Sequence, residues 1–472
     1  MAVDRSARPW VALFAIAIGV ALIVMDTTIV NVITPSLIGG LGINSSQAQW
    51  IQESYTIVFA ALLLVAGRVA DLRGAKTVFL WGVLIFGLTS ILAGLAWTGS
   101  VLVTSRFLQG VGAAMILPTS LALLNHMFKG AARGQAFAVW GTTIGAATAI
   151  GPVLGGWLSE HVSWRWAFGL NIPLAIVILV IGSIFIVEPE RSKGRVDLLS
   201  AVLSVIGLGL VAFGLLEGRV YGWFGIKEPF HFFGTTWDSG LSPAFLALVI
   251  AIVPLGIFIW RQVLISSGRR DHQPLMDMNL FKIASFRNGN IATVIIGLGE
   301  FGVIAVFPLW LVFSLGYSAL AAGGTIVAIA VGSFFASGMS FPLSENERVT
   351  PLALVRIGLI LEAIGLVALG LVVAYTDANW WFIALALFVY GIGVGFATAQ
   401  VTNVVLADVP AEDGGMSSGV QSMFRQLGSA LGIAILTTVF FSTLGSTLQE
   451  KLVKAGQSVA EATQFSGAVT DS

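Results

Sequence analysis

The sequence contains no cysteine, so it forms neither a disulfide bond nor a thiolate metal site. Charged residues are also scarce, at 10% of the chain, whereas soluble proteins average about 25%. The net charge is +0, so nothing in the composition suggests a nucleic-acid partner. Hydrophobic residues make up 57% of the chain, and its mean hydropathy is +0.93. Together these deficits exclude an ordinary soluble protein and indicate a chain that crosses a membrane several times.

Thirteen segments have the length of about 20 mostly apolar residues that crosses a bilayer. The first continues through Asp26 to Pro35 without a small-residue cleavage site, so we interpret it as an uncleaved span and not as a signal peptide. An odd number of spans is unexpected in a fold of paired halves. We therefore expect a final helix to be missing from this sequence, with a true thirteen-span protein as the alternative. The predicted spans are 10–36, 48–67, 77–97, 100–124, 134–158, 166–187, 196–216, 241–261, 286–313, 319–342, 351–375, 380–406 and 413–441.

Lysine and arginine are distributed unevenly between the connecting loops. With the N-terminus inside, 17 of the 24 basic residues lie on the inner side, five on the outer side, and two within spans. The five outer residues are Arg165, Arg219, Lys227, Lys451 and Lys454. The positive-inside rule therefore predicts a multi-pass protein of the cell (inner) membrane with a cytoplasmic N-terminus.

The loop between the second and third spans reads "GRVADLRGAKTV" and places glycines and charges at a tight turn. Glycine permits the turn, and an aspartate there can bind the N-terminus of a helix, where negative charge is favoured. An ordinary turn that obeys the positive-inside rule is the alternative. The predicted gating residues of this loop are Gly67, Asp71, Arg73, Gly74 and Lys76.

The stretch "GAATAIGPVLGGW" (145–157) places proline and glycine inside the fifth span. Both are poor helix formers, and a broken backbone hydrogen bond is costly in lipid unless neighbouring protein replaces it. We expect this segment to gain close packing or a bend in return. Its predicted gating residues are Gly145, Gly151, Pro152, Gly155 and Gly156.

Several motifs occur in the order typical of the major facilitator superfamily. "GRVADLRGAK" resembles its loop signature, with Leu72 and Ala75 where arginine is usual, and "RFLQGVGAA" in the fourth span resembles its buried-arginine motif. The stretch 145–157 resembles the motif of its proton-coupled antiporters. Four further stretches resemble the fourteen-helix drug:proton antiporter family: "MDTTIVNVITP", "SWRWAFGLNIP", "GVGFATAQVTNVVLADVP" and "SSGVQSMFRQLGSALGIA".

This resemblance implies an all-α polytopic membrane protein with the major facilitator fold, in which two six-helix bundles flank two linker helices and the final helix is absent from this chain. The expected divisions are 1–190 for the first bundle, 191–280 for the linker spans and an outer loop, and 281–472 for the second bundle. In the family, the Gly-Pro segment closes the outer end of the cavity by packing against the second half. Small-residue packing without a transport role is the alternative.

The resemblance also implies a function: proton-coupled export of hydrophobic, cationic drugs or toxic compounds by alternating access. The expected partners are small molecules, protons and the lipid bilayer, in a monomer without enzymatic activity, cofactor or metal. One rival is a transporter of the same fold that moves a lipid or a specific metabolite, which a wide lateral opening would favour. Another is a non-transporting sensor or assembly partner. A membrane enzyme has the least support, because the four histidines are scattered and no phosphate-binding G-x-x-x-x-G-K-[ST] loop occurs.

Ionisable residues inside spans are costly and are therefore candidates for function. Asp26 and Arg106 lie at similar depth and can form a buried pair, which is either structural or part of proton coupling. Glu300 and Glu362 fall near the midplane with no basic residue nearby in sequence. We expect an unpaired carboxyl group there to exchange a proton, with Glu300 as the first choice. A protonated carboxyl group that only joins two helices is the alternative.

The remaining candidates are polar and aromatic residues predicted to line the substrate cavity. Buried acids outnumber buried arginines, and aromatic rings add cation–π surface, which together suit lipophilic cations. We expect Glu53 at the outer vestibule and Arg425 as the partner of one of the acids. The predicted cavity residues are Glu53, Tyr55, Gln109, Phe301, Trp310, Tyr390, Gln400, Asn403 and Arg425.

Overall fold

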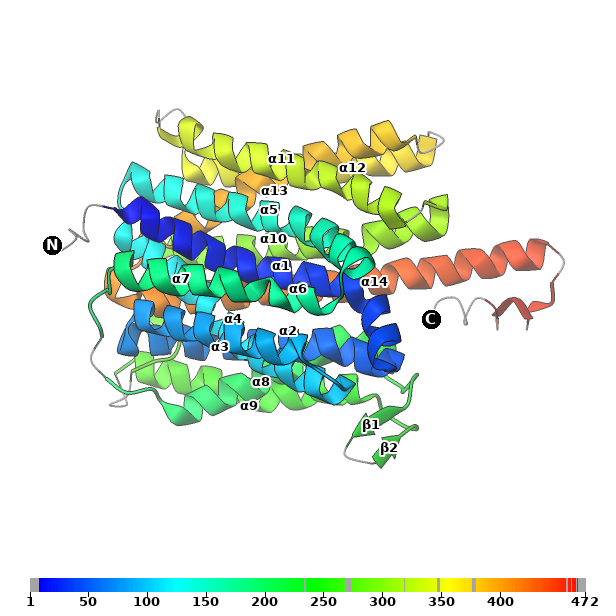
Figure 1. Cartoon of the computed structure of the whole chain (residues 1–472), viewed down its shortest axis with the longest axis horizontal. Coiled ribbons are helices and arrows are strands. Elements are labelled where there is room, and N and C mark those ends of the chain that lie inside the picture. Colours follow the sequence, from blue (N-terminus) through cyan, green and yellow to red (C-terminus); the bar gives the residue numbers. More distant parts are fainter. Residues whose placement is uncertain are drawn as a thin grey trace.

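The computed structural model describes residues 8–192, 194–232, 235–268, 273–317, 319–345, 349–375, 379–455, 457–459, 461–463 and 465. Five basic residues that were counted on the inner side lie outside the described residues: Arg5, Lys193, Arg269, Arg270 and Arg348. The described chain is mostly helical, and its long helices run side by side along the long axis of the molecule (Figure 1).

The first bundle contains five long helices and one span that is broken in two. Asn44 and Thr98 cap two of the helices, since their side chains accept hydrogen bonds from Gln47 N at 2.8 Å and Val101 N at 3.3 Å. The elements are α1 (Pro9–Leu41), α2 (Ser45–Arg73), α3 (Ala75–Gly94), α4 (Gly99–Met127), α5 (Ala131–His161), α6 (Arg165–Gly169) and α7 (Asn171–Phe185).

The linker comprises two helices and a small hairpin between them. Helices α8 (Leu198–Tyr221) and α9 (Pro243–Ser266) pack on each other, and strands β1 (Phe230–Phe232) and β2 (Thr235–Trp237) are antiparallel. A short 3₁₀ helix, η2 (Met278–Lys282), leads into the second bundle.

The second bundle contains five long helices, of which the last projects beyond the others (Figure 1). They are α10 (Ala284–Leu315), α11 (Ala319–Glu345), α12 (Pro351–Tyr375), α13 (Trp380–Val405) and α14 (Gly414–Lys454), with the 3₁₀ helix η3 (Ala411–Asp413) before α14.

Each of the thirteen predicted spans corresponds to a helix or to the pair α6–α7. Within the described residues, twelve helical segments are long and apolar enough to cross a membrane, and α11 contains a shorter apolar run, Gly324–Ser340. The main differences from the prediction are one break within a span and one helix that is much longer than predicted. The span 166–187 is broken at Leu170, and the helix predicted to end at residue 441 continues to Lys454. The chain is therefore a multi-pass membrane protein.

The two bundles meet along two lines of contact, which we name the α2/α14 seam and the α5/α11 seam. Helix α8 packs against both α2 and α14 and so lies over the first seam, with α9 outside it (Figure 1). We name the two ends of the molecule after α1: the Pro9 end, where α1 begins, and the Leu41 end, where it finishes.

Candidate functional site

Asp26, the acid of the first bundle, lies in a buried polar network. Arg106 Nη1 of α4 forms an ion pair with Asp26 Oδ2 of α1, and both side chains are only 1% exposed. Gln109 Nε2 and Asn171 Nδ2 donate to Asp26 Oδ1 at 3.0 and 2.7 Å, and both amides also donate to Ser90 Oγ. The predicted Asp26–Arg106 pair is thus confirmed, and both carboxylate oxygens of Asp26 are satisfied.

Arg106 also contacts a backbone oxygen and an aromatic ring. Arg106 Nε donates to the backbone oxygen of Ile51 at 3.1 Å, and the guanidinium lies 4.2 Å from the centre of the Tyr55 ring. Tyr55 and Gln109, which were predicted to line the cavity, are buried around this arginine. The arrangement fixes the charge in one position.

In the second bundle, one of the two midplane acids has a counter-ion. Arg425 Nη2 of α14 lies 3.1 Å from Glu300 Oε2 of α10, and the Phe301 ring lies 5.9 Å from the same guanidinium. The expectation of an unpaired Glu300 is therefore wrong, whereas a partnership between Arg425 and one of the acids is confirmed. The pair forms because α10 and α14 pack closely: a methyl group at Gly297 would lie 2.9 Å from Arg425 O.

The second midplane acid, Glu362 of α12, has no such partner. Its side chain is buried, and Oε1 forms no hydrogen bond with any described residue; the same holds for the hydroxyl of Tyr390. A methyl group at Gly299 would lie 3.6 Å from Glu362 Oε2 and 3.5 Å from that hydroxyl, so both groups face α10. Glu362 therefore has the surroundings that were expected of Glu300.

Three predicted cavity residues lie apart from these acids. Gln400 of α13 donates to Ser340 Oγ of α11 at 3.1 Å, and Asn403 Oδ1 accepts from Arg133 Nε of α5 at 3.0 Å. These contacts join α13 to α11 and α5 towards the Pro9 end. Trp310 lies on α10 near the opposite end and packs beside Phe307.

The loop signature binds the N-terminus of a helix as predicted, and that helix belongs to the other bundle. Asp71 accepts hydrogen bonds from Gly415 N at 2.6 Å and Met416 N at 2.7 Å, at the start of α14. Binding of Asp71 to a helix N-terminus is thus confirmed. Its basic neighbour is Arg68, at 3.5 Å, while Arg73 is exposed. Arg68 was missed, although its spacing of three residues from Asp71 on one helix could have revealed it.

The two glycines of the loop signature have different roles, and an acid from a distant part of the chain completes the turn after α2. Gly74 has φ +100°, which favours glycine, and a methyl group at Gly67 would lie 2.9 Å from Gly419 Cα of α14. Lys76 Nζ donates to Ser183 O at 2.8 Å. Glu188, absent from our candidates, accepts from the backbone nitrogen of Lys76 at 3.0 Å and so caps the first turn of α3.

The Gly-Pro segment packs differently from the prediction. Methyl groups at Gly151, Gly155 and Gly156 would meet α1, at Thr28, Ile29 and Val32 respectively. Expecting these three to pack against the second half is therefore wrong, because α5 lies along α1 of its own bundle. Gly145 does face the second half: a methyl group there would lie 3.4 Å from Ser333 Oγ of α11. Pro152 is accommodated within the helix.

Direct hydrogen bonds between the bundles gather at one end. Among the described residues they are the Asp71 contacts with α14 and the contact between Arg133 and Asn403, all towards the Pro9 end. Within the same residues, no three His, Asp or Glu side chains form a metal-binding group.

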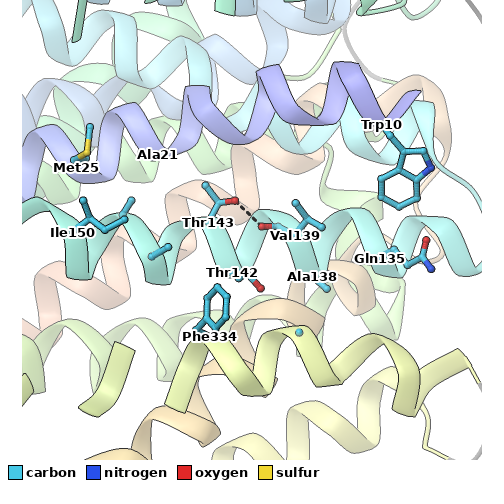
Figure 2. Close-up of a pocket in the computed structure, with 13 residues that line it drawn as sticks. Trp10, Ala21, Met25, Gln135, Ala138, Val139, Thr142, Thr143, Ile150 and Phe334 are labelled. Atoms are coloured by element: carbon cyan, nitrogen blue, oxygen red, sulfur yellow. Dashed lines mark hydrogen bonds between the residues drawn. The ribbon is translucent and has the colours of Figure 1, made fainter. Parts of the chain in front are cut away.

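An apolar pocket of about 760 Å³ opens at the α5/α11 seam. Figure 2 shows Phe334 of α11 opposite Thr142 of α5, with Trp10 towards one end and Ile150 towards the other. Thr143 donates to Val139 O at 2.8 Å, so its hydroxyl is satisfied within its own helix. The lining residues are Trp10, Ala21, Met25, Gln135, Ala138, Val139, Thr142, Thr143, Ala146, Ala147, Ile150, Phe334 and Gly338.

Most of the chain matches a known protein family. Residues 16–433 match the family model described as Major Facilitator Superfamily. The chain is 31% identical to the multidrug efflux pump LfrA of Mycolicibacterium smegmatis, over 92% of this chain and 81% of that protein. It is 27% identical to the tetracenomycin C resistance and export protein of Streptomyces glaucescens, over 95% and 79%.

Among solved structures, the fold is similar to that of the human organic anion transporter MFSD10. The TM-score is 0.64 at 14% identity, and the match covers 90% of this chain and 92% of that one. At this identity the likeness concerns the fold alone.

Proposed function

Because the chain belongs to the Major Facilitator Superfamily, we propose that it exports hydrophobic small molecules by alternating access and draws its energy from a proton gradient. The observation that carries this proposal is the apolar pocket at the α5/α11 seam. In a transporter built of two bundles, a site between them is exposed to either side as the bundles rock.

The chemistry of the pocket supports a hydrophobic substrate. Its volume of about 760 Å³ falls within the range of about 300–1,000 Å³ that holds drug-sized molecules. Apart from Gln135 and two threonines its lining is apolar, so it offers van der Waals contact and few directional hydrogen bonds. The relatives named for multidrug efflux and for antibiotic export support the same substrate class.

The acids of the second bundle support a cationic substrate and proton coupling. The charges of Glu300 and Glu362 repel each other. Arg425 forms an ion pair with Glu300. A buried carboxyl group without a counter-ion is costly when ionised, so a proton or a cation stabilises it. We assign the coupling proton to Glu362, which is not among the residues that line the pocket, so the proton acts on the substrate through the motion of the bundles. Asp26, whose charge is already compensated, holds the first bundle together.

We further propose that the Pro9 end is cytoplasmic in the inner membrane and that the monomer is the transporting unit. The distribution of lysine and arginine supports this orientation. The pocket then extends from Trp10 and Gln135 at the cytoplasmic end towards Ile150, deeper in the membrane, and we propose that hydrophobic compounds reach its cytoplasmic end sideways from the inner leaflet. The divisions 1–190, 191–280 and 281–472 are supported by the contacts within each bundle.

The test uses purified protein in liposomes with an imposed pH gradient and a fluorescent lipophilic cation. Wild-type protein is expected to concentrate the cation against its gradient. Glu362→Gln is expected to abolish that uphill transport while leaving downhill exchange of the cation, because the substrate pocket remains intact. Uphill transport at the wild-type rate by this variant would remove Glu362 from the mechanism. Absence of gradient-driven transport for several such cations would contradict drug export.

The lateral position of the pocket also favours one rival, movement of a membrane lipid. The same liposomes, loaded with a fluorescent phospholipid in one leaflet, distinguish the two functions. Exchange of that lipid between leaflets by the protein, combined with no transport of the cations, would replace drug export by lipid transport.

A further inference from the structure

Two carboxyl groups meet between the first bundle and the linker, far in sequence from the acids assigned above. Gln49 Nε2 of α2 donates to Glu53 Oε1 and to Glu217 Oε2 of α8, each at 2.9 Å. Since both oxygens bind the same nitrogen, they lie less than about 6 Å apart. Glu53 therefore faces α8. The sequence had predicted that it lies at the outer vestibule.

The Gln49 amide donates to only one oxygen of each carboxyl group. Glu217 is completely buried, and its Oε1 forms no hydrogen bond with any described residue; the same is true of Glu53 Oε2. A buried carboxylate oxygen without a donor is costly. The two unsatisfied oxygens therefore indicate a missing ligand of positive charge.

Aromatic rings separate this site from water at the Leu41 end. Trp50, next to Gln49, stacks on Phe213 of α8 at 6.2 Å, and Phe230 of β1 packs edge-on against Phe213 at 6.0 Å. Phe230 also contacts Tyr221 at 5.0 Å. The hairpin thus covers the last turn of α8, and the low polarity it creates raises the cost of two negative charges.

Among the described residues, Arg219 of α8 supplies one positive charge that acts on the pair. Arg219 of α8 attracts Glu53, and its guanidinium lies 4.4 Å from the centre of the Phe441 ring of α14. Tyr221 is the other titratable group of α8 nearby. At this level α14 presents Phe441 and Thr438, and α9 presents Leu248 against Gly214. Beyond the end of α8, Lys227 N donates to Tyr221 O at 3.0 Å. On α2, Tyr55 packs on Arg106, which is paired with Asp26.

We propose that Glu53 and Glu217 form a second proton-binding site, in which the two carboxyl groups hold one proton between them. Two carboxyl groups at this separation do not both ionise readily, because each charge opposes the other. With one proton the pair carries a single negative charge, which Arg219 offsets. The bound proton supplies the donor that the unsatisfied oxygens lack, and it holds α8 against α2.

The position of α8 gives this proton a structural consequence. Helix α8 contacts the first bundle through Glu217. Trp223, two residues beyond the end of α8, contacts the second bundle, because its Nε1 donates to Thr438 Oγ1 of α14 at 3.0 Å. Loss of the proton leaves two negative charges between α2 and α8 and loosens the linker from the first bundle at the Leu41 end. This site is independent of the substrate and coupling residues proposed above.

The experiment is an infrared pH titration of the purified chain in lipid nanodiscs, without substrate. The background variant Glu362→Gln removes the other unpaired buried acid. We follow the carbonyl band of a protonated carboxyl group in that background and after adding Glu53→Gln, Glu217→Gln, or both. The matched control is Glu450→Gln, which removes an exposed carboxyl group of α14. Size-exclusion profiles establish that each variant is folded.

If one proton is shared, Glu53→Gln and Glu217→Gln each remove the same single band. The double variant then loses no further band, and the control variant changes none. Gln49→Leu, which removes the donor that stabilises the ionised pair, is expected to keep the band to higher pH. Two separate bands that disappear independently would overturn the shared proton. A band that is unchanged in both single variants, or one that disappears when sodium is added at constant pH, would overturn it as well. None of these outcomes depends on transport, so failure here is distinct from failure of the export proposal.

Discussion

At the scale of single residues, two buried acids with the same chemistry have opposite surroundings. Asp26 accepts hydrogen bonds from an arginine and two amides, whereas Glu362 Oε1 finds no donor among the described residues. The first setting supplies a counter-ion and hydrogen-bond donors, and the second supplies no donor to Oε1 among the described residues. The first acid therefore suits a fixed structural charge, and the second a group that changes its charge during a cycle.

This contrast predicts opposite effects on stability. Asp26→Asn leaves Arg106 buried without its counter-ion, which typically costs about 3–5 kcal/mol, so the unfolding temperature is expected to fall clearly. Glu362→Gln removes an acid that has no counter-ion among the described residues, and it is expected to leave that temperature unchanged or to raise it. Thermal unfolding in detergent measures both. Equal losses in the two variants would contradict the different roles assigned to these acids.

The sequence predicted how deep each buried charge lies along its helix, but not which way its side chain points around the helix axis. Counting residues from the span ends placed Asp26 beside Arg106, because both were constrained to one bundle and one depth. The same count placed Glu300 and Glu362 together and could not show which of them faces Arg425, which is 125 residues from Glu300 in sequence. That choice depends on how α10 and α14 rotate against each other, which side-chain packing decides.

At the scale of helices, the close approach of α2 and α14 depends on glycine. Gly67→Ala would place a methyl group 2.9 Å from Gly419 Cα, against backbone that cannot rotate away. We expect this variant to separate the helices, weaken the Asp71 contacts and lower the unfolding temperature. Gly256→Ala on α9 is the control, because a methyl group there meets nothing within 4 Å and improves helix propensity by about 1 kcal/mol. Equal stability of the two variants would show that the α2/α14 seam tolerates separation.

The two linker helices are joined by an ion pair whose contribution depends on pH. Arg261 Nε and Nη2 of α9 donate to Asp197 at 2.8 and 2.9 Å, and Ser200 Oγ donates to it at 2.6 Å. Burial alone would raise the pKa of Asp197, but the hydrogen bonds from Arg261 and Ser200 outweigh it and lower this pKa to about 2.

A folded pKa below the unfolded value of about 3.9 means that the ion pair stabilises the fold above that pH and stops doing so as the pH falls towards 2. Asp197→Asn is therefore expected to cost about 1.5–3 kcal/mol near neutral pH. The difference in unfolding temperature from wild type should shrink between pH 4 and pH 2. A difference that stays constant over this range would contradict the assignment.

Glycine spacing predicted that α5 packs closely but not against which helix. Gly151 and Gly155 are four residues apart and so share one face, which requires a near neighbour. The sequence pattern is the same whether that neighbour belongs to the same bundle or to the other one. The observed partner is α1, which lies along α5 within the first bundle, and only Gly145 reaches α11.

At the scale of the whole molecule, the two seams between the bundles differ. Helices α8 and α9 lie over the α2/α14 seam, whereas the α5/α11 seam holds the apolar pocket. The number and order of the spans were predictable from hydropathy, since membrane helices must satisfy their backbones internally. The side on which the linker helices lie was not, because lipid-facing and protein-facing apolar surfaces look alike in sequence.

This asymmetry predicts that motion across the α5/α11 seam is essential for transport. The chain has no cysteine of its own, so a pair introduced by Gly145→Cys and Ser333→Cys is unambiguous. A Cβ atom at Gly145 would lie 3.9 Å from Ser333 Cβ, within the 3.5–4.5 Å range that a disulfide bond requires. Oxidation is expected to join α5 to α11 and to stop gradient-driven export in liposomes, and a reducing agent should restore it. The single variant Gly145→Cys, oxidised in the same way, should transport before and after treatment. Undiminished transport by the fully cross-linked protein would show that the bundles do not separate along this seam, and the access route for hydrophobic compounds would then have to lie elsewhere.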